Sequence, residues 1–239
     1  MDNPGYTTLT RQSGLMAEMQ AVANNIANAS TTGFRREGVI FSEFVAALDG
    51  NDPSLSMATA NVRDTRMEQG PLTQTGGTFD LAIEGEGFFL VQGPTGPMLT
   101  RAGHFTPNQA GELVTPDGYQ LLDAGGAPVF APPDAANIAV AADGTLSADG
   151  EPIGQLGLYL PADPLDIRHR DGVRFEVPGG TVPVIDGVVI LQGYLENSNV
   201  NPIGEIARMI EIQRAYEQGQ AFLQQEDDRI RGVLQTLGG

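Results

Sequence analysis

The sequence contains no cysteine, no tryptophan and no lysine, and it has only two histidines. Without cysteine the chain can form neither a disulfide nor a thiolate metal site. His104 and His169 stand in no spacing that metal ligands use, so we expect no bound metal ion. The thirteen basic residues are all arginine. Codon bias of a GC-rich genome is our preferred explanation, and the better pairing and stacking of arginine at buried contacts is the alternative.

Targeting signals are also missing. No run of about 18 apolar residues occurs, so we expect no membrane-spanning helix and no direct insertion into a membrane. Residues 1–6 lack a basic region followed by an apolar core, so we expect no cleaved secretory signal.

Motifs for catalysis and cofactor binding are absent as well. Gly85 and Gly87 are followed by no helix that could hold a phosphate, and no serine stands in a recognised nucleophile motif. Asp143 and Asp149 precede glycines, but they lack the ligand alternation and terminal glutamate of a calcium loop. We therefore predict no catalytic residue, no metal ion and no cofactor, and a protein that is not an enzyme.

The net charge of −17 is distributed unevenly. Residues 1–36 carry +1 and residues 203–239 carry −2, so the middle of the chain carries −16. An acidic chain repels nucleic acid and anionic lipid, so neither is an expected partner. Terminal segments that are nearly neutral are expected of packed helices, and a strongly acidic middle segment is expected of a domain exposed to solvent.

The sequence pattern of residues 7–32 predicts a first helix. Their apolar positions, among them Leu15, Val22 and Ile26, fall on one helical stripe. The last turns are rich in asparagine, which is a poor helix former. Gly33 can adopt the left-handed conformation that ends a helix.

Residues 203–236 predict a longer helix, with Asn201 as its N-cap and Pro202 in its first turn. Apolar residues follow a three- and four-residue spacing, broken only by Gly219 and Glu226. Charged residues of alternating sign form a ladder on this helix: Glu205, Arg208, Glu211, Arg214 and Glu217. A solvated face is our preferred interpretation of the ladder, and contacts between neighbouring subunits are the alternative.

Residues 78–195 have the pattern of short strands separated by turns. Asp-Gly, which supplies the positive φ that tight hairpin turns require, occurs five times here, beginning at Asp117, Asp143, Asp149, Asp171 and Asp186. The predicted fold class is therefore α+β. The two terminal helices would form a discontinuous, coiled-coil-like domain, with an all-β antiparallel domain inserted between them.

Three stretches of the sequence resemble one known family. They are Asn24–Asn28 with Ser30–Arg35, then Asp80–Phe89 with Thr100–Phe105, and finally Gly193–Asn201 with Met209–Glu217. These stretches resemble the signatures of the bacterial flagellar axial proteins, which build the rod and the hook. That family usually has leucine where this chain has Ile26.

The resemblance implies a domain organisation. Residues 1–34 would be the N-terminal helix of a rod-core helical domain, residues 35–77 an extended connector, residues 78–202 the β domain, and residues 203–239 the C-terminal helix. The connector rests on the resemblance alone.

The resemblance also implies a function. The chain looks like a structural subunit of the flagellar basal-body rod. It resembles subunits of the proximal rod more than those of the distal rod. It would polymerise through its terminal helices into part of the drive shaft and export channel. Its partners would be copies of itself, other proximal and distal rod subunits, and the flagellar type III export apparatus. It would be exported with its N-terminus uncleaved and lie in the basal body, spanning the periplasm.

Other interpretations stay open at this point. The hook protein fits less well, because it carries a further β domain. From the residues alone, a soluble β-domain binding module with helical oligomerisation ends is possible. An enzyme ranks third, because no catalytic constellation occurs.

Two sets of residues are candidate assembly sites by resemblance. The N-terminal motif consists of Asn24, Asn25, Ile26, Asn28, Thr31, Gly33 and Phe34. The C-terminal set consists of Met209, Ile210, Ile212, Gln213, Arg214, Tyr216, Leu223 and Ile230.

We predict that both terminal helices are largely unfolded before assembly. One apolar seam does not offset the conformational entropy of ordering so long a helix, so a second set of neighbours is needed. Hydrogen exchange should find residues 7–32 and 203–236 near the unstructured rate in the free chain, and protected in rods. Strong protection in the free chain would contradict this prediction.

Overall fold

The computed structural model describes residues 3–46, 55–163, 165–184 and 187–237, and the chain divides into two compact units. The first unit comprises residues 1–27, 37–66 and 201–239, and the second comprises residues 28–36 and 67–200. The chain therefore passes between the units four times.

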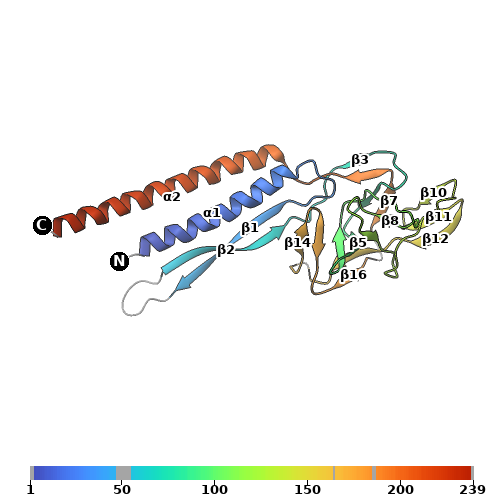
Figure 1. The fold of residues 1–239 in the computed structure, drawn as a ribbon, viewed down its shortest axis with the longest axis horizontal. Coiled ribbons are helices and arrows are strands. Elements are labelled where there is room, and N and C mark those ends of the chain that lie inside the picture. Colours follow the sequence, from blue (N-terminus) through green and yellow to red (C-terminus); the bar gives the residue numbers. More distant parts are fainter. Residues whose placement is uncertain (1–2, 47–54, 164, 185–186, 238–239) are drawn as a thin grey trace. The chain divides into compact units, whose positions relative to one another are not determined.

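The first unit contains two long helices and a hairpin. Helix α1 spans Asn3–Ala27, helix α2 spans Pro202–Leu237, and strands β1 (Glu37–Ala46) and β2 (Leu55–Thr65) pair antiparallel. Helix α1 lies beside α2 and also contacts both strands (Figure 1).

The helix pair has one small apolar core. Leu15 and Val22 of α1 are buried against Ile212 of α2. The partly buried side chains around them are Met19, Ile26, Met209, Ala215 and Tyr216. The apolar stripes predicted for the two ends of the chain therefore pack against each other.

Both helix boundaries have local causes. Helix α1 ends five residues earlier than predicted, because Asn28 begins a turn in which the backbone N–H and the Oγ1 of Thr31 each donate to Asn28 at 3.1 Å. Helix α2 has the predicted cap. Oδ1 of Asn201 accepts hydrogen bonds from the backbone N–H groups of Ile203 and Gly204, each at 3.2 Å.

Within residues 35–77, the range that we expected to be an extended connector, the structure has an antiparallel hairpin. Strands β1 and β2 pair along their length, beginning with Glu37 opposite Thr65. Eight residues separate the strands, whereas the strongest sequence signal for a hairpin is a two-residue turn. The turn expected at residues 49–54 lies outside the described residues.

The second unit is built from short antiparallel strands. They are β3 (Leu72–Gln74), β4 (Leu81–Glu84), β5 (Phe88–Gly93), β6 (Gly96–Thr100), β7 (Thr106–Pro107), β8 (Leu113–Val114), β9 (Gln120–Leu121), β10 (Ile138–Val140), β11 (Thr145–Ala148), β12 (Glu151–Gln155), β13 (Leu158–Pro161), β14 (Arg168–Asp171), β15 (Arg174–Glu176), β16 (Thr181–Pro183), β17 (Val189–Gln192) and β18 (Tyr194–Glu196). The largest sheet has the order β14-β15-β6-β5-β9-β8-β7, with β13 pairing β5 and β16. Smaller sheets are β10-β11-β12, β17-β4 and β18-β3.

Strand β5 is central to the core of this unit. Its side chains alternate between two buried clusters, with Phe89 and Val91 in one and Phe88 and Leu90 in the other. Because both faces of the strand are covered, its apolar run is continuous.

Four of the five predicted Asp-Gly turns are confirmed, and Asp186 of the fifth lies outside the described residues. Each of their glycines has a positive φ, from 54° at Gly172 to 88° at Gly150. These two glycines lie between paired strands, β14 with β15 and β11 with β12 respectively. Local turn chemistry therefore determines much of the connectivity in the second unit.

One carboxylate makes the stability of this unit depend on pH. Oδ2 of Asp80 accepts a hydrogen bond from Oγ1 of Thr75 at 2.5 Å, and Oδ1 lies 2.6 Å from Nδ1 of His104. Partial burial raises the pKa of Asp80, but these contacts outweigh it and hold the pKa below its ordinary value of 3.8. A carboxyl group whose pKa falls on folding stabilises the fold above its unfolded-state pKa.

We predict that Asp80→Asn lowers the free energy of unfolding at pH 7 by about 1–2 kcal/mol. The difference from the natural protein should disappear as the pH falls through the folded-state pKa of Asp80, because the carboxylate is then protonated. Chemical denaturation at pH 7 and in the acid range measures both effects. Asp134→Asn, at an exposed aspartate, is the control and should change little. An undiminished difference in acid would contradict the prediction.

Candidate assembly site

Asn25 of α1 is fully buried and connects three elements of the first unit. Its Nδ2 donates to the carbonyl oxygen of Glu37 at 2.7 Å and to Oε2 of Glu205 at 3.1 Å, and its Oδ1 accepts from the backbone N–H of Glu37 at 2.9 Å. Asn24 also donates to Oε2 of Glu37, at 3.3 Å. Because Glu37 begins β1 and Glu205 lies in the first turn of α2, one amide joins α1, β1 and α2. This explains an asparagine near the end of a helix.

The charged ladder on α2 is not a uniform solvated face. Glu205 is only 3% exposed and bonds to Asn25, and Nη2 of Arg208 lies 2.6 Å from Oε1 of Glu18 on α1. The hydrogen bond with Glu18 raises the pKa of Arg208. Our preferred interpretation was therefore wrong for Glu205, which is buried, whereas Arg208 is 48% exposed and also pairs with α1. A solvated face does describe the position of Glu211, which is exposed and pairs with Arg208 along the same helix.

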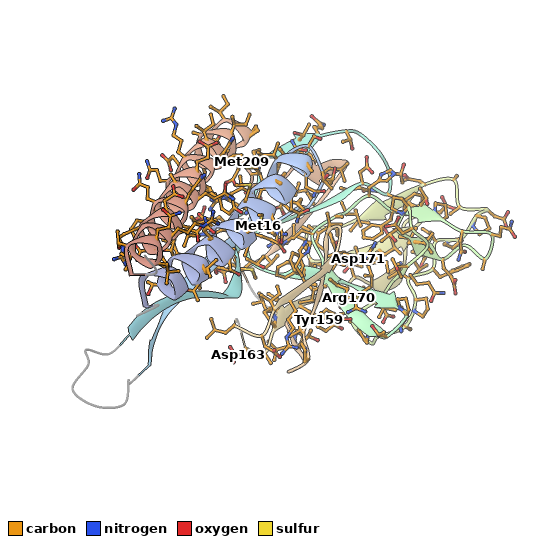
Figure 2. All side chains as sticks on the ribbon, turned by 60° about the vertical axis from the view of Figure 1, so that its left-hand side comes forward. Met16, Tyr159, Asp163, Arg170, Asp171 and Met209 are labelled. Carbon is orange, nitrogen blue, oxygen red and sulfur yellow. The ribbon has the colours of Figure 1, made fainter. Side chains whose placement is uncertain are left out.

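The predicted C-terminal set divides between two faces of α2. Ile212 is buried, and Met209 and Tyr216 pack against its cluster, so these three belong to the helix pair. Figure 2 shows Met209 on α2 and Met16 on α1 among the side chains of the two helices. The remaining members are half-buried Leu223 and exposed Ile210, Gln213, Arg214 and Ile230.

Exposed apolar side chains remain on both helices. Ile203, Ile206 and Ile210 form a stripe along the first turns of α2, with exposed fractions of 80%, 51% and 44%. Leu9 and Met16 are exposed on α1. Further exposed apolar residues follow along α2: Phe222, Ile230, Val233 and Leu234.

The second half of the N-terminal motif lies in the second unit. The backbone N–H of Gly33 donates to the carbonyl oxygen of Glu196 at 2.7 Å, and Gly33 has a φ of 71°. A Cβ at this position would lie 2.2 Å from the backbone nitrogen of Ala102. Both the positive φ and the close approach therefore require glycine. Phe34 is fully buried, with its ring edge-on to His169.

A buried ion cluster lies beside this turn. Glu196 of β18 is 1% exposed, and its carboxylate oxygens lie 2.6 Å from Nη1 of Arg35 and 2.9 Å from Nη1 of Arg101. Arg101 also donates to the carbonyl oxygens of Ile83 at 3.1 Å and Gly85 at 2.5 Å. Burial lowers the pKa of Arg101 to about 10, although Glu196 favours its charged form. Arg101 is therefore still charged at pH 7.

Sequence reasoning did not select the three charged residues of this cluster. Each one stands in a different stretch of the family resemblance: Arg35 in the first, Arg101 in the second and Glu196 in the third. The available signal for these residues was that each is charged and stands in a motif made mainly of small, apolar and amide residues. Their pairing was not visible, because Arg101 and Glu196 are 95 positions apart.

Family models match three parts of the chain. Residues 6–35 match the flagella basal body rod protein model, residues 82–148 the D1 domain of the flagellar hook protein FlgE/F/G, and residues 191–236 the C-terminal model of the flagellar basal body rod FlgEFG proteins. The three members of the ion cluster fall one in each matched range.

Curated relatives align with the chain from end to end. A flagellar basal-body rod protein FlgF of Caulobacter vibrioides is 42% identical over 246 residues, which cover all of this chain and 99% of the relative. The chain belongs to the flagellar basal-body rod protein family. A second FlgF protein, of Mesorhizobium japonicum, is 37% identical with the same coverage. A FlgG protein of Bacillus subtilis is 30% identical over 97% of this chain and 96% of its own length, so the chain is more similar to these FlgF members of the family.

Membership of the basal-body rod family makes the chain a structural subunit of the flagellar basal-body rod. Two further findings concern the described residues. They contain no cluster of three or more histidine, aspartate and glutamate side chains that could hold a metal ion. None of their helices is long and apolar enough to cross a membrane.

We predict that Gly33→Ala destabilises the second unit by about 2–5 kcal/mol, because alanine meets an unfavourable φ and the backbone of Ala102 together. Gly118→Ala is the matched control. Its φ of 86° is similar, but a Cβ there meets nothing within 4 Å, so the cost should be limited to about 1–2 kcal/mol. Chemical unfolding of both variants measures the difference. Equal losses would show that the close approach at Gly33 is unimportant.

Proposed function

We propose that the chain polymerises through its terminal helices into the proximal part of the rod, and so into the drive shaft and export channel. The observation that carries this proposal is the stripe of Ile203, Ile206 and Ile210, which remains exposed although α1 already covers the opposite face of α2. A contiguous exposed apolar patch is typical of a protein interface. The stripe therefore meets neighbouring subunits.

The exposed patches differ from one another, which favours an open assembly. The α2 patch consists of isoleucines on its first turns, whereas the α1 patch contains Leu9 and Met16. A symmetric dimer would place one patch against a copy of itself and leave the other exposed. Head-to-tail contacts between unlike patches cover both, and they continue as a helical filament when the rotation does not close.

The unequal lengths of the two helices also favour assembly with neighbouring subunits. Helix α2 has 36 residues and α1 has 25, so α2 is longer by about 16 Å at 1.5 Å per residue. The helices are antiparallel, because Asn25 contacts Glu205 whereas Gln12 lies beside Gly219. The last turns of α2, with Ile230 and Leu234 exposed, therefore extend past the start of α1 and need a neighbour.

The N-terminal motif and the C-terminal set of candidate assembly residues then have different structural roles. Within the N-terminal motif, Asn24, Asn25 and Ile26 hold the first unit together, and Asn28, Thr31, Gly33 and Phe34 form the turn and its anchor in the second. Within the C-terminal set, Met209, Ile212 and Tyr216 pair with α1. Neighbouring subunits contact the other members: Ile210, Gln213, Arg214, Leu223 and Ile230.

The partners and location follow from the same proposal. The chain assembles with copies of itself and with other proximal and distal rod subunits, and the flagellar type III export apparatus delivers it with its N-terminus uncleaved. It then lies in the rod where the rod spans the periplasm, and it has no enzymatic activity. These statements are supported by its family membership and by the small core of its helix pair. A distal position is the second candidate, since FlgG proteins are also 30–32% identical to it.

The test is a double variant, Ile206→Gln with Ile210→Gln, on the exposed face of α2. We predict that cells carrying it make no complete rods and are non-motile, while the free protein unfolds at the same denaturant concentration as the natural one, because neither side chain is buried. Electron microscopy of basal bodies and swimming assays provide the readout.

The matched control is Val182→Gln, the same kind of change at an exposed apolar residue of the second unit. It should leave rods and motility intact. Normal rods in the double variant would overturn assembly through this face of α2.

A further inference from the structure

The segments that lead the chain into and out of the second unit are fastened to one another. We call residues 33–36, 68–71 and 196–199 the clasp. They lie beside three of the four points at which the chain passes between the units. A Cβ on Gly70 would lie 2.1 Å from the carbonyl oxygen of Asn197, so two of these segments approach as closely as glycine permits.

Two side chains make most of the contacts in the clasp. Oδ1 of Asn199 accepts from the backbone N–H of Arg36 at 2.6 Å, and Nδ2 of Asn199 donates to the carbonyl oxygen of Glu68 at 2.8 Å. Oε1 of Glu196 accepts from the backbone N–H of Gly70 at 2.9 Å, in addition to its pairing with Arg35 and Arg101. Arg35 also donates to the carbonyl oxygen of Glu68, so every segment is bonded to the other two.

The clasp is held by polar contacts rather than by the sheet core. None of its described residues belongs to either apolar cluster of the second unit. Its charges are also unequal, because one carboxylate faces two buried guanidinium groups. The Nε atoms of Arg35 and Arg101 have no hydrogen-bond partner among the described residues. Its one large apolar side chain is Phe34, whose ring contacts His169, which in turn contacts Phe175 of the core. A region held mainly by polar contacts can open while the core stays folded.

Opening the clasp would change the chain that links the two helices. With the clasp closed, five residues lie between the end of α1 and Gly33, and two lie between Asn199 and the start of α2. With the clasp open, the β1–β2 hairpin stays paired in the first unit, and the free linking chain grows from about seven residues to about thirty. The scaling of loop-closure entropy with length then makes pairing of α1 with α2 about tenfold less favourable.

We propose that the clasp is a conformational device that sets the pairing of the terminal helices. When it is closed, it holds the start of α2 close to the end of α1 and raises their effective concentration about tenfold. This acts within a single chain and does not depend on the proposed polymerisation.

The test uses the full chain with Glu18→Cys and Arg208→Cys, which replace an ion pair between α1 and α2 and are its only thiols. A short bismaleimide either links the two cysteines or caps each one separately, and the ratio of linked to capped protein reports the effective concentration. Adding Glu196→Gln should lower this ratio about tenfold. Hydrogen exchange of strands β5 and β6 should remain within twofold of the parent, since the core is separate.

Arg174→Gln is the matched control. Arg174 is also a buried arginine of the second unit, paired with Asp117 at 2.6 Å and Asp171 at 3.0 Å, but it lies outside the clasp. It should leave the ratio unchanged. An unchanged ratio with Glu196→Gln, or an equal fall with Arg174→Gln, would overturn the proposal.

If Glu196→Gln also opens β5 and β6, Asn199→Ala replaces it as the deciding variant. This change removes two hydrogen bonds of the clasp without leaving a buried charge unpaired. The ratio should then fall severalfold with the core protected, and an unchanged ratio would overturn the proposal.

Discussion

The clasp of the second unit depends on one carboxylate that lies between two buried arginines. Glu196 offsets the burial of Arg35 and Arg101, and its remaining hydrogen-bonding capacity is used by the backbone of Gly70. Removing such a carboxylate would leave two cations uncompensated in a buried site, which strongly destabilises the closed form of the clasp. Because its partners come from distant parts of the sequence, this interaction forms only when the ends of the second unit meet.

The first unit uses the same principle with a neutral side chain. Its apolar core is small, and an apolar seam alone tolerates sliding of one helix along the other. Asn25 prevents this, because its buried amide is satisfied only when Glu37 and Glu205 are both in place. The helix pair thus gains a defined register from polar contacts while its outer apolar face remains available to neighbours.

The errors of sequence reasoning have a common cause. The α2 cap at Asn201, the Asp-Gly turns and the apolar stripes were predicted, because each depends on residues close together in the chain. The β1–β2 hairpin and the early end of α1 were missed. The burial of Glu205 and the ion pair of Arg208 with Glu18 were missed too, because periodicity describes a helix face without saying what packs on it.

The sequence by itself determined the fold class, the family and the two stretches from which the long helices form. Local propensity, turn chemistry and sequence motifs are properties of short segments, so they can be recognised in the sequence without a structure. Only the tertiary structure decided that Arg35, Arg101 and Glu196 share one buried site, and that Asn25 serves two partners. The physical reason is that burial and ion pairing depend on the separation of groups in space, which sequence distance does not specify.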